Sequence, residues 1–214
     1  MKIGPFVRKM MPFAMERRVA AIYRRIFVDL RAVASPLAAD LARNARVLDI
    51  GGGDGELLNA LLTARPDLSV TMVDIAPSVG KFLDRHVIDR VERCPATSLE
   101  QHLEARAGTY DAVLVSDVMH HIPRGLRTDF VRDLVRAVKP GSSIYIKDIE
   151  PGHAVATLSY LSDVYISGDK GVSLVSMKDM AELVSGQMPG YIATEQGLIG
   201  INPPNYLLRF HREY

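Results

Sequence analysis

The chain has 214 residues, 48% of them hydrophobic, and a formal net charge of +1, which suits one domain with a sizeable core. Its single cysteine, Cys94, excludes an internal disulfide framework and leaves too few thiolates for a zinc site, which is typical of a reducing compartment. No apolar run reaches about 18 residues and the N-terminus has no signal-like apolar core, so we expect a cytoplasmic protein without a transmembrane helix.

Basic residues are concentrated near the start of the chain. Up to Arg31 there are eight basic and two acidic residues, whereas the remainder has 18 basic and 23 acidic ones. Residues Phe13–Ala34 carry apolar side chains at three- and four-residue steps, with Arg17, Arg24 and Arg31 opposite them. We predict an amphipathic helix within a separate N-terminal segment, residues 1–44. It is either a lid with a solvated basic side, or a contact to a membrane surface or to a lipid-like substrate.

The first strand follows a predicted helix break. Ser35-Pro36 is expected to end the basic helix, and Leu37–Arg43 to form a short second helix. The stretch Arg46–Leu62, RVLDIGGGDGELLNALL, then combines a buried strand, a glycine-rich turn and an amphipathic helix. Glycines allow positive φ angles and let a ligand approach the backbone closely, so this junction is the first candidate for a binding site.

Strands and helices alternate after this junction. Further strands are predicted at 70–75, 91–94, 110–115 and 142–149, and helices from Pro77-Ser78, from Ser98 and over 124–138. Later helices are expected over 153–166 and, with Ser176 as N-cap, over 177–187, followed by strands at 193–199 and 206–211. This order predicts an α/β fold with a doubly wound, mostly parallel sheet, whose ligands bind beyond the carboxyl ends of the strands.

Two nucleotide-binding patterns fit the glycine turn poorly. It lacks the third glycine of the dinucleotide fingerprint, and no Gly-Lys-Ser/Thr makes a P-loop. Instead Asp49, Gly51, Gly53 and Gly55 form D-x-G-x-G-x-G, and Asp74 ends the next strand. This pattern resembles motifs I and II of the class I S-adenosylmethionine-dependent methyltransferases, over roughly residues 46–150. The resemblance implies a Rossmann-like methyltransferase fold for residues 45–214, with seven strands, an antiparallel C-terminal hairpin and an N-terminal helical lid.

The resemblance also implies a cofactor site. The backbone of the glycine turn would lie against the methionine and ribose parts of S-adenosylmethionine, and Asp74 would accept hydrogen bonds from both ribose hydroxyls. The candidate cofactor-binding residues are Asp49, Gly51, Gly52, Gly53, Asp74, Ile75, Ala96, Thr97, Ser116 and Asp117. The turn after the third strand, RCPATS, lacks the acidic residue that commonly receives the adenine amino group, which leaves the backbone or Thr97 for that task.

The stretch YDAVLVSDVMHHIP resembles the fourth motif of the family. A histidine at the position of His120 is the general base in plant-type O-methyltransferases, and a neutral imidazole suits proton abstraction near neutral pH. His120 is therefore our catalytic candidate, although relatives with His-His-Ile here also methylate carbon, so a wall residue is the alternative. His121, His153 and Tyr160 are candidates for binding the acceptor, and no metal site is expected.

The expected reaction is methyl transfer from S-adenosylmethionine to an oxygen or carbon of a small organic acceptor, lipid-like molecules and secondary metabolites included. No Asn/Asp-Pro-Pro-Tyr/Phe/Trp motif follows the fourth strand, which argues against methylation of nucleic-acid bases. Two alternatives are open: a protein that binds the cofactor but catalyses a non-methylating reaction, and a membrane-surface binding module. The sequence leaves the oligomeric state open, a dimer included.

Overall fold

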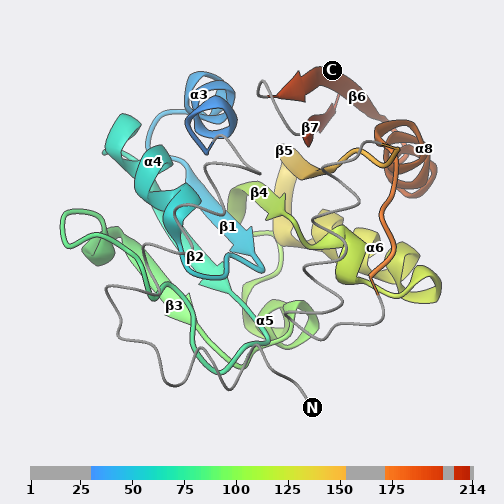
Figure 1. The fold of residues 1–214 in the computed structure, drawn as a ribbon. Coiled ribbons are helices and arrows are strands. Elements are labelled where there is room, and N and C mark those ends of the chain that lie inside the picture. Colours follow the sequence, from blue (N-terminus) through green and yellow to red (C-terminus); the bar gives the residue numbers. More distant parts are fainter. Residues whose placement is uncertain (1–29, 153–171, 200–204, 213–214) are drawn as a thin grey trace, which may run out of the picture.

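A seven-stranded sheet in the order β3-β2-β1-β4-β5-β7-β6 forms the centre of the computed structural model, which describes residues 30–152, 172–199 and 205–212 (Figure 1). The strands are β1 (Arg46–Ile50), β2 (Ser69–Val73), β3 (Val91–Cys94), β4 (Tyr110–Ser116), β5 (Val138–Ile149), β6 (Tyr191–Ile199) and β7 (Asn205–Arg212). Neighbours among β1 to β5 are parallel, and β7 runs antiparallel to both β5 and β6. The predicted doubly wound sheet with an antiparallel C-terminal hairpin is confirmed.

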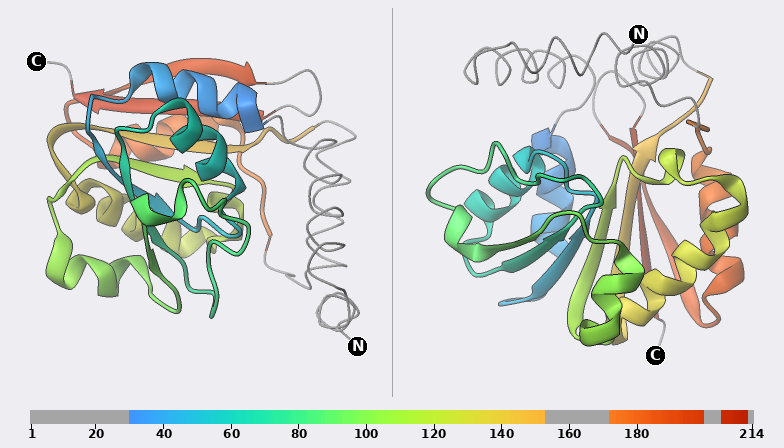
Figure 2. Two further views of the ribbon diagram at one scale, coloured as in Figure 1. Left: turned by 90° about the vertical axis from the view of Figure 1, so that its left-hand side faces the viewer. Right: turned by 90° about the horizontal axis from the view of Figure 1, so that it is seen from below.

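Helices cover both faces of the sheet (Figure 2). The α-helices are α3 (Leu30–Asp40), α4 (Glu56–Ala64), α5 (Leu99–Arg106), α6 (Arg127–Ala137) and α8 (Met177–Gln187), and short 3-10 turns are η1 (Ile88–Arg90), η2 (Met119–His121) and η3 (Arg124–Leu126). Buried residues of α3 and α4 join one core cluster, and those of α5, α6 and α8 join a second. None of the described helices is both long and apolar enough to cross a membrane.

Each central strand contributes to both cores. In β1, Val47 belongs to the cluster under α3 and α4, whereas Leu48 and Ile50 belong to the cluster under α5, α6 and α8. Successive side chains of a strand point to opposite faces, so a strand covered on both faces needs a continuous apolar run. This requirement explains why the first strand was recognisable in the sequence.

The predicted helix break at Ser35-Pro36 is wrong, because Pro36 lies inside α3. Proline in a helix interior costs about 3 kcal/mol or more, since it removes a hydrogen bond and crowds the preceding turn. Val33 and Leu37, on either side of it, are each only 1% exposed and pack in the core with α4. Burial of these side chains against the sheet offsets the cost of the proline.

The helix predicted from Pro77-Ser78 is absent, and short turns alternate with irregular backbone in this stretch before η1. Gly80 has φ +66°, and its N–H donates to the Gly53 carbonyl at 2.8 Å. The N–H of Phe82 likewise donates to the Asp54 carbonyl at 2.8 Å. These bonds to the glycine turn use backbone groups that a helix would need for itself.

Most other boundaries agree with the predictions within a few residues. The largest difference is β5, which begins at Val138, before the Pro140-Gly141 pair that was expected to end the preceding helix. The predicted helix over 153–166, most of the basic helix over 13–34 and the loop between the last two strands lie outside the described residues. The division into a segment 1–44 and a domain 45–214 remains a prediction.

Candidate active site

The glycine turn after β1 presents backbone atoms at the carboxyl edge of the sheet. Gly51 and Gly53 have φ angles of +67° and +54°, which L side chains rarely adopt. A Cβ atom on Gly52 would lie 2.1 Å from the Asp49 Oδ2 atom and 2.6 Å from the Met72 methyl carbon, so a side chain there would displace these buried neighbours. Gly53, in contrast, is exposed, and a Cβ atom on it would meet only a backbone oxygen at 3.9 Å. A ligand can therefore approach the backbone at Gly53.

Asp74, directly after β2, joins the glycine turn to the residues that follow β2. Its Oδ2 atom accepts a hydrogen bond from the Gly53 N–H at 3.1 Å, and its Oδ1 atom accepts one from the Ala76 N–H at 2.8 Å. A carboxylate has about four acceptor positions, so each oxygen retains capacity for a further donor. The half-buried carboxylate is thus held in place and can still receive two hydroxyl groups of a ligand.

Asp49 lies buried beneath the turn. Burial and, second, the negative charge of Asp74 raise the pKa of Asp49 to about 7. Two carboxylates close together disfavour ionisation unless a positive charge is nearby. The site accordingly suits a cationic ligand with hydroxyl groups, and S-adenosylmethionine, with a sulfonium, an ammonium and a ribose, has both features. The observed residues fit this cofactor.

The ends of β2 and β3 bring three further cofactor candidates together, and the last two, Ser116 and Asp117, lie at the end of β4. Ala96 has φ +52°, and its N–H donates to the Ala76 carbonyl at 2.8 Å. The Thr97 N–H donates to the Asp74 carbonyl at 3.0 Å, while its hydroxyl donates to the Pro95 carbonyl at 2.9 Å. The side chain of Ile75 is 81% exposed beside them. An apolar side chain and backbone groups therefore border this edge, as the missing carboxylate in RCPATS implies.

Asn59 of α4 is a supporting residue that the sequence analysis missed. Its side-chain amide donates to the Phe82 carbonyl at 2.8 Å and accepts from the Asp84 N–H at 2.9 Å. The residue is only 7% exposed. Asn59 thus ties the segment after β2 to α4, beside the glycine turn. A polar residue within the apolar run 57–62 was the available signal.

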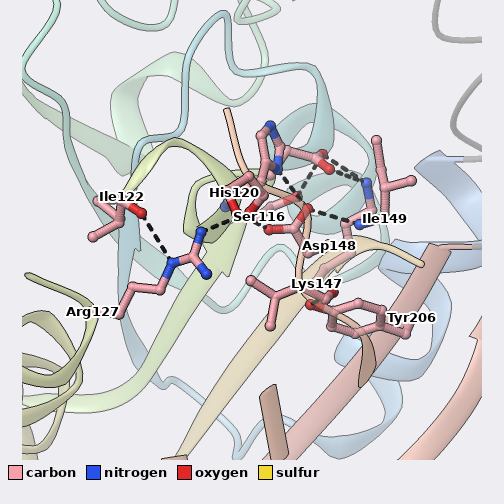
Figure 3. A network of polar contacts seen from close by, with 11 residues as sticks. Ser116, His120, Ile122, Arg127, Lys147, Asp148, Ile149 and Tyr206 are labelled. Atoms are coloured by element: carbon pink, nitrogen blue, oxygen red, sulfur yellow. Dashed lines mark hydrogen bonds and ion pairs between the residues drawn. The ribbon is translucent and has the colours of Figure 1, made fainter. Parts of the chain in front are cut away.

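His120 lies at the carboxyl edge of β4, in the turn η2, and forms a buried pair with Asp148 at the end of β5 (Figure 3). The His120 Nδ1 atom is 2.6 Å from the Asp148 Oδ1 atom, and the His120 backbone N–H donates to Oδ2 at 3.2 Å. The two side chains are 3% and 0% exposed. Asp148 therefore orients both the ring and the backbone of His120.

The negative charge of Asp148 determines the tautomer of His120. Burial by itself would raise the pKa of Asp148, but His120, the Ile149 N–H and the Lys147 ammonium together lower it below its ordinary value. An ionised Asp148 accepts a proton-bearing nitrogen, which places the hydrogen of neutral His120 on Nδ1 and the lone pair on Nε2. Asp148 was not predicted, although a carboxylate at the carboxyl end of the fifth strand was a usable signal.

A second set of contacts holds the turn that carries His120. The buried Arg127 guanidinium donates to the Ile122 carbonyl at 3.0 Å (Figure 3). It also donates to the Ser173 carbonyl at 2.7 Å. The Ser173 N–H donates in turn to the His120 carbonyl at 2.8 Å. The approach to α8 is thus joined to the turn η2 through backbone groups, which sequence patterns do not reveal.

The candidates for binding the acceptor are only partly placed. His121 is exposed, and its ring centroid is 4.1 Å from that of His120. His153 and Tyr160 lie outside the described residues. Over residues 30–152, 172–199 and 205–212, no group of three or more His, Cys, Asp or Glu side chains could hold a metal ion.

The sheet order, the glycine turn and the acidic residue after β2 define the class of protein. They form the Rossmann-like fold of the class I S-adenosylmethionine-dependent methyltransferases. Among solved structures, apo SibL, an S-adenosylmethionine-dependent methyltransferase, has a TM-score of 0.72 at 19% identity over 94% of this chain and 59% of its own. That likeness concerns the fold alone.

Sequence comparison identifies the domain itself. Residues 48–144 match the family model described as "Methyltransferase domain". The chain is 30% identical to 2,7-dihydroxy-5-methyl-1-naphthoate 7-O-methyltransferase of Streptomyces carzinostaticus, over 66% of this chain and 43% of that protein. It is 26% identical to ubiquinone biosynthesis O-methyltransferase of Vibrio parahaemolyticus, over 52% of this chain and 46% of that protein. The chain thus contains a class I S-adenosylmethionine-dependent methyltransferase domain, as its motifs predicted.

A solved structure agrees with these relatives. The mitomycin 7-O-methyltransferase MmcR has a TM-score of 0.67 and 26% identity, over 87% of this chain and 54% of that chain. The chain spans less than half the length of the curated relatives described above.

Proposed function

We propose that this protein transfers the methyl group of S-adenosylmethionine to a hydroxyl oxygen of a small aromatic acceptor, with His120 as the general base. The observation that carries the proposal is the buried His120–Asp148 pair, which lies at the sheet edge that also carries the glycine turn and Asp74. The names of the relatives support the acceptor class, since they include O-methyltransferases of a dihydroxynaphthoate and of ubiquinone biosynthesis.

When bound, the cofactor supplies a sulfonium-activated methyl group. The residues proposed to hold it are Gly51 to Gly53 and Asp49 along the methionine part, Asp74 at the ribose hydroxyls, and Ile75, Ala96 and Thr97 around the adenine. Ser116 and Asp117 complete the site at the end of β4. Because the methyl group is already activated, most of the remaining barrier is lowered by aligning the acceptor oxygen with it.

The pairing of His120 with Asp148 supports a role of His120 in proton removal. In the proposed step, the lone pair of Nε2 would take the proton of the acceptor hydroxyl. The oxygen would receive the methyl group as its bond to the sulfonium sulfur breaks, which would leave S-adenosylhomocysteine. The imidazolium that results is stabilised by Asp148, which accepts from Nδ1 over 2.6 Å. The proton then returns to solvent, and the base is restored. An acceptor that is already an enolate or phenolate would not need this residue.

Residues 1–29, outside the described part of the chain, carry most of the arginine pattern. We infer that this basic segment covers the acceptor, with contact to an anionic membrane surface as the alternative. Deleting it should then reduce acceptor turnover and leave cofactor affinity nearly intact. Salt-sensitive binding of the full chain to anionic liposomes, lost when Arg17, Arg24 and Arg31 are reversed in charge, would favour the membrane contact.

The reaction is tested by incubating the protein with S-adenosylmethionine and a panel of phenols, hydroquinones and aromatic hydroxy acids. Formation of S-adenosylhomocysteine together with a methyl ether is the expected result. The dependence of kcat on pH should show a rising limb between about pH 5.5 and 8, which is lost in His120→Ala. Product methylated on carbon, or a wild-type profile that overlays the mutant one, would contradict general-base O-methylation.

A further inference from the structure

A second ion pair, of which only the lysine is buried, lies next to the His120–Asp148 pair. The Lys147 ammonium is 2.6 Å and 2.7 Å from the two carboxylate oxygens of Asp117. The Lys147 side chain is 0% exposed, whereas that of Asp117 is 37% exposed. The backbones are paired as well, since the Asp117 N–H donates to the Lys147 carbonyl at 2.9 Å. Lys147 therefore holds Asp117 through both side chain and main chain.

Asp117 is the residue at which the chain turns from β4 towards His120. Its φ of +58° is in the left-handed region, which aspartate adopts more readily than most residues. The next residue, Val118, packs against the glycine turn so closely that a Cβ atom on Gly51 would lie 2.4 Å from its Cγ2 atom. This bend thus contacts the cofactor turn on one side and continues into η2 on the other.

The end of β5 holds this loop from both faces of the sheet. Lys147 and Asp148 are consecutive in β5, so their side chains point to opposite faces. Lys147 binds Asp117 at the start of the loop. Asp148 binds His120 near its far end (Figure 3). Four charged or titratable groups, two of them from one strand end, therefore define the position of a five-residue turn.

We propose that Lys147 is a positioning residue that fixes the Asp117 bend, so that the cofactor turn and His120 keep their relative placement. A fully buried ammonium is strongly unfavourable without an anionic partner, so any excursion of Asp117 towards solvent is opposed. Because buried Lys147 needs the Asp117 carboxylate as its partner, the ion pair restrains the bend. The part of this proposal that concerns catalysis rests on the proposed function, whereas the part that concerns cofactor binding does not.

The test compares two ion pairs between the same strands. Lys139 of β5 pairs with Asp111 of β4, near the opposite end of the strands, and its side chain is 44% exposed. Lys147→Met and Asp117→Asn remove the pair at the site, and Lys139→Met is the matched control. Asparagine tolerates the left-handed conformation as aspartate does, so Asp117→Asn removes the charge without disturbing the backbone at this position. Its effect therefore reports the loss of the charge alone.

Two readouts are measured at 25 °C on folded protein: the Kd of S-adenosylhomocysteine by calorimetry, and kcat with a turned-over acceptor. Displacement of catalytic groups by about 1 Å can cost roughly 10²-fold in rate, so kcat should fall by about that factor in Lys147→Met and Asp117→Asn, and Kd should rise roughly tenfold. Lys139→Met should change both values by less than about twofold, because a partly exposed pair contributes little.

The outcomes separate this proposal from the proposed function. Equal Kd and kcat values for Lys147→Met, Asp117→Asn and Lys139→Met would overturn the positioning role. A lower melting temperature of Lys147→Met or Asp117→Asn with unchanged Kd and kcat would overturn it as well. If Lys147→Met does not fold, Asp117→Asn decides in the same way. Suppose that the wild-type protein methylates no acceptor, but that Lys147→Met and Asp117→Asn bind S-adenosylhomocysteine more weakly than the wild type does. The positioning of the bend would then be supported, and the proposed O-methylation would fail.

Discussion

The two halves of the candidate site are built by different means. At the ends of β1 to β3, contacts run between backbone groups or from the backbone to Asp74, as in the bonds of Gly53 to Asp74 and of Ala96 to Ala76. At the ends of β4 and β5, ionisable side chains meet in two pairs, His120 with Asp148 and Asp117 with Lys147, and all but Asp117 are buried. The cofactor half therefore depends on chain conformation, whereas the acceptor half depends on charges that must remain paired.

This difference predicts where single substitutions act. A change in the acceptor half should affect the rate and leave cofactor affinity intact, unless it moves the Asp117 bend. A change in the cofactor half should affect ligand affinity or the stability of the ligand-free protein. Substitutions in each half test whether the halves separate in this way.

The largest effect is expected for the His120–Asp148 pair. His120→Ala should lower kcat with a protonated phenol by about 10² to 10⁴, because the general base is lost. Asp148→Asn should lower it within the same range, since an amide stabilises the imidazolium poorly. The double variant should be little worse than His120→Ala, as for residues that act as one unit. Losses in kcat that add up in the double variant would contradict the view that the two residues act as one unit. A Kd for S-adenosylhomocysteine that changes more than about twofold would contradict the separation of the two halves.

Asp49→Asn should stabilise the ligand-free protein, and more so at higher pH. The folded-state pKa of about 7 exceeds the ordinary value of 3.8, so the folded protein binds this proton more tightly than the unfolded chain. Stability is therefore lost as pH rises between these values, by up to roughly 4 kcal/mol. Urea unfolding at pH 5 and pH 8 should show the larger gain for the variant at pH 8.

Asp111→Asn is the matched control for this pH dependence. Burial would raise the pKa of Asp111, but the Lys139 ammonium and the Arg46 N–H lower it below its ordinary value. The ionised form therefore stabilises the folded protein above the unfolded-state pKa, and Asp111→Asn should be destabilising at pH 8. If both substitutions lower the free energy of unfolding at pH 8, the buried carboxylate of Asp49 does not destabilise the folded protein.

Asp74→Ala should weaken binding of S-adenosylmethionine by about 1.5 to 3 kcal/mol, the usual range for hydrogen bonds to a charged group. The carboxylate also receives the N–H groups of Gly53 and Ala76, so part of the loss comes from a less ordered turn. Calorimetry on folded protein measures the change, and kcat at saturating cofactor should stay near the wild-type value. Unchanged affinity would rule out the assigned ribose contact.

The smallest effects are expected for two helix caps, one after β3 and one before α8. Ser98 accepts the Gln101 N–H in a capping box at α5, and Ser176 accepts the Asp179 N–H at α8. Replacing either serine by alanine should lower the free energy of unfolding by about 1 kcal/mol. Neither change should alter the affinity for cofactor. A loss of affinity in Ser176→Ala would indicate that α8 is coupled to the cofactor half.

The misplaced elements show where local patterns are overruled. Proline at position 36 is a correct local signal for a helix end, but burial of Val33 and Leu37 against α4 is worth more than the helix defect. Pro77-Ser78 is equally good as a helix start. There, hydrogen bonds from Gly80 and Phe82 to the glycine turn hold the chain in turns instead. In both places contacts with distant residues decide the conformation.

The sequence by itself determined the strand, glycine turn and helix after Arg46, the acidic residue after β2 and the order of strands and helices, because each of these follows from short-range periodicity and backbone preference. Only the tertiary structure identified Asp148, Lys147 and Arg127 as partners of the turn that carries His120. His120 and Asp148 are 28 residues apart, and Asp117 and Lys147 are 30 apart. Such pairs form because parallel strands align their carboxyl ends across intervening helices, and no local sequence pattern encodes which side chains meet there.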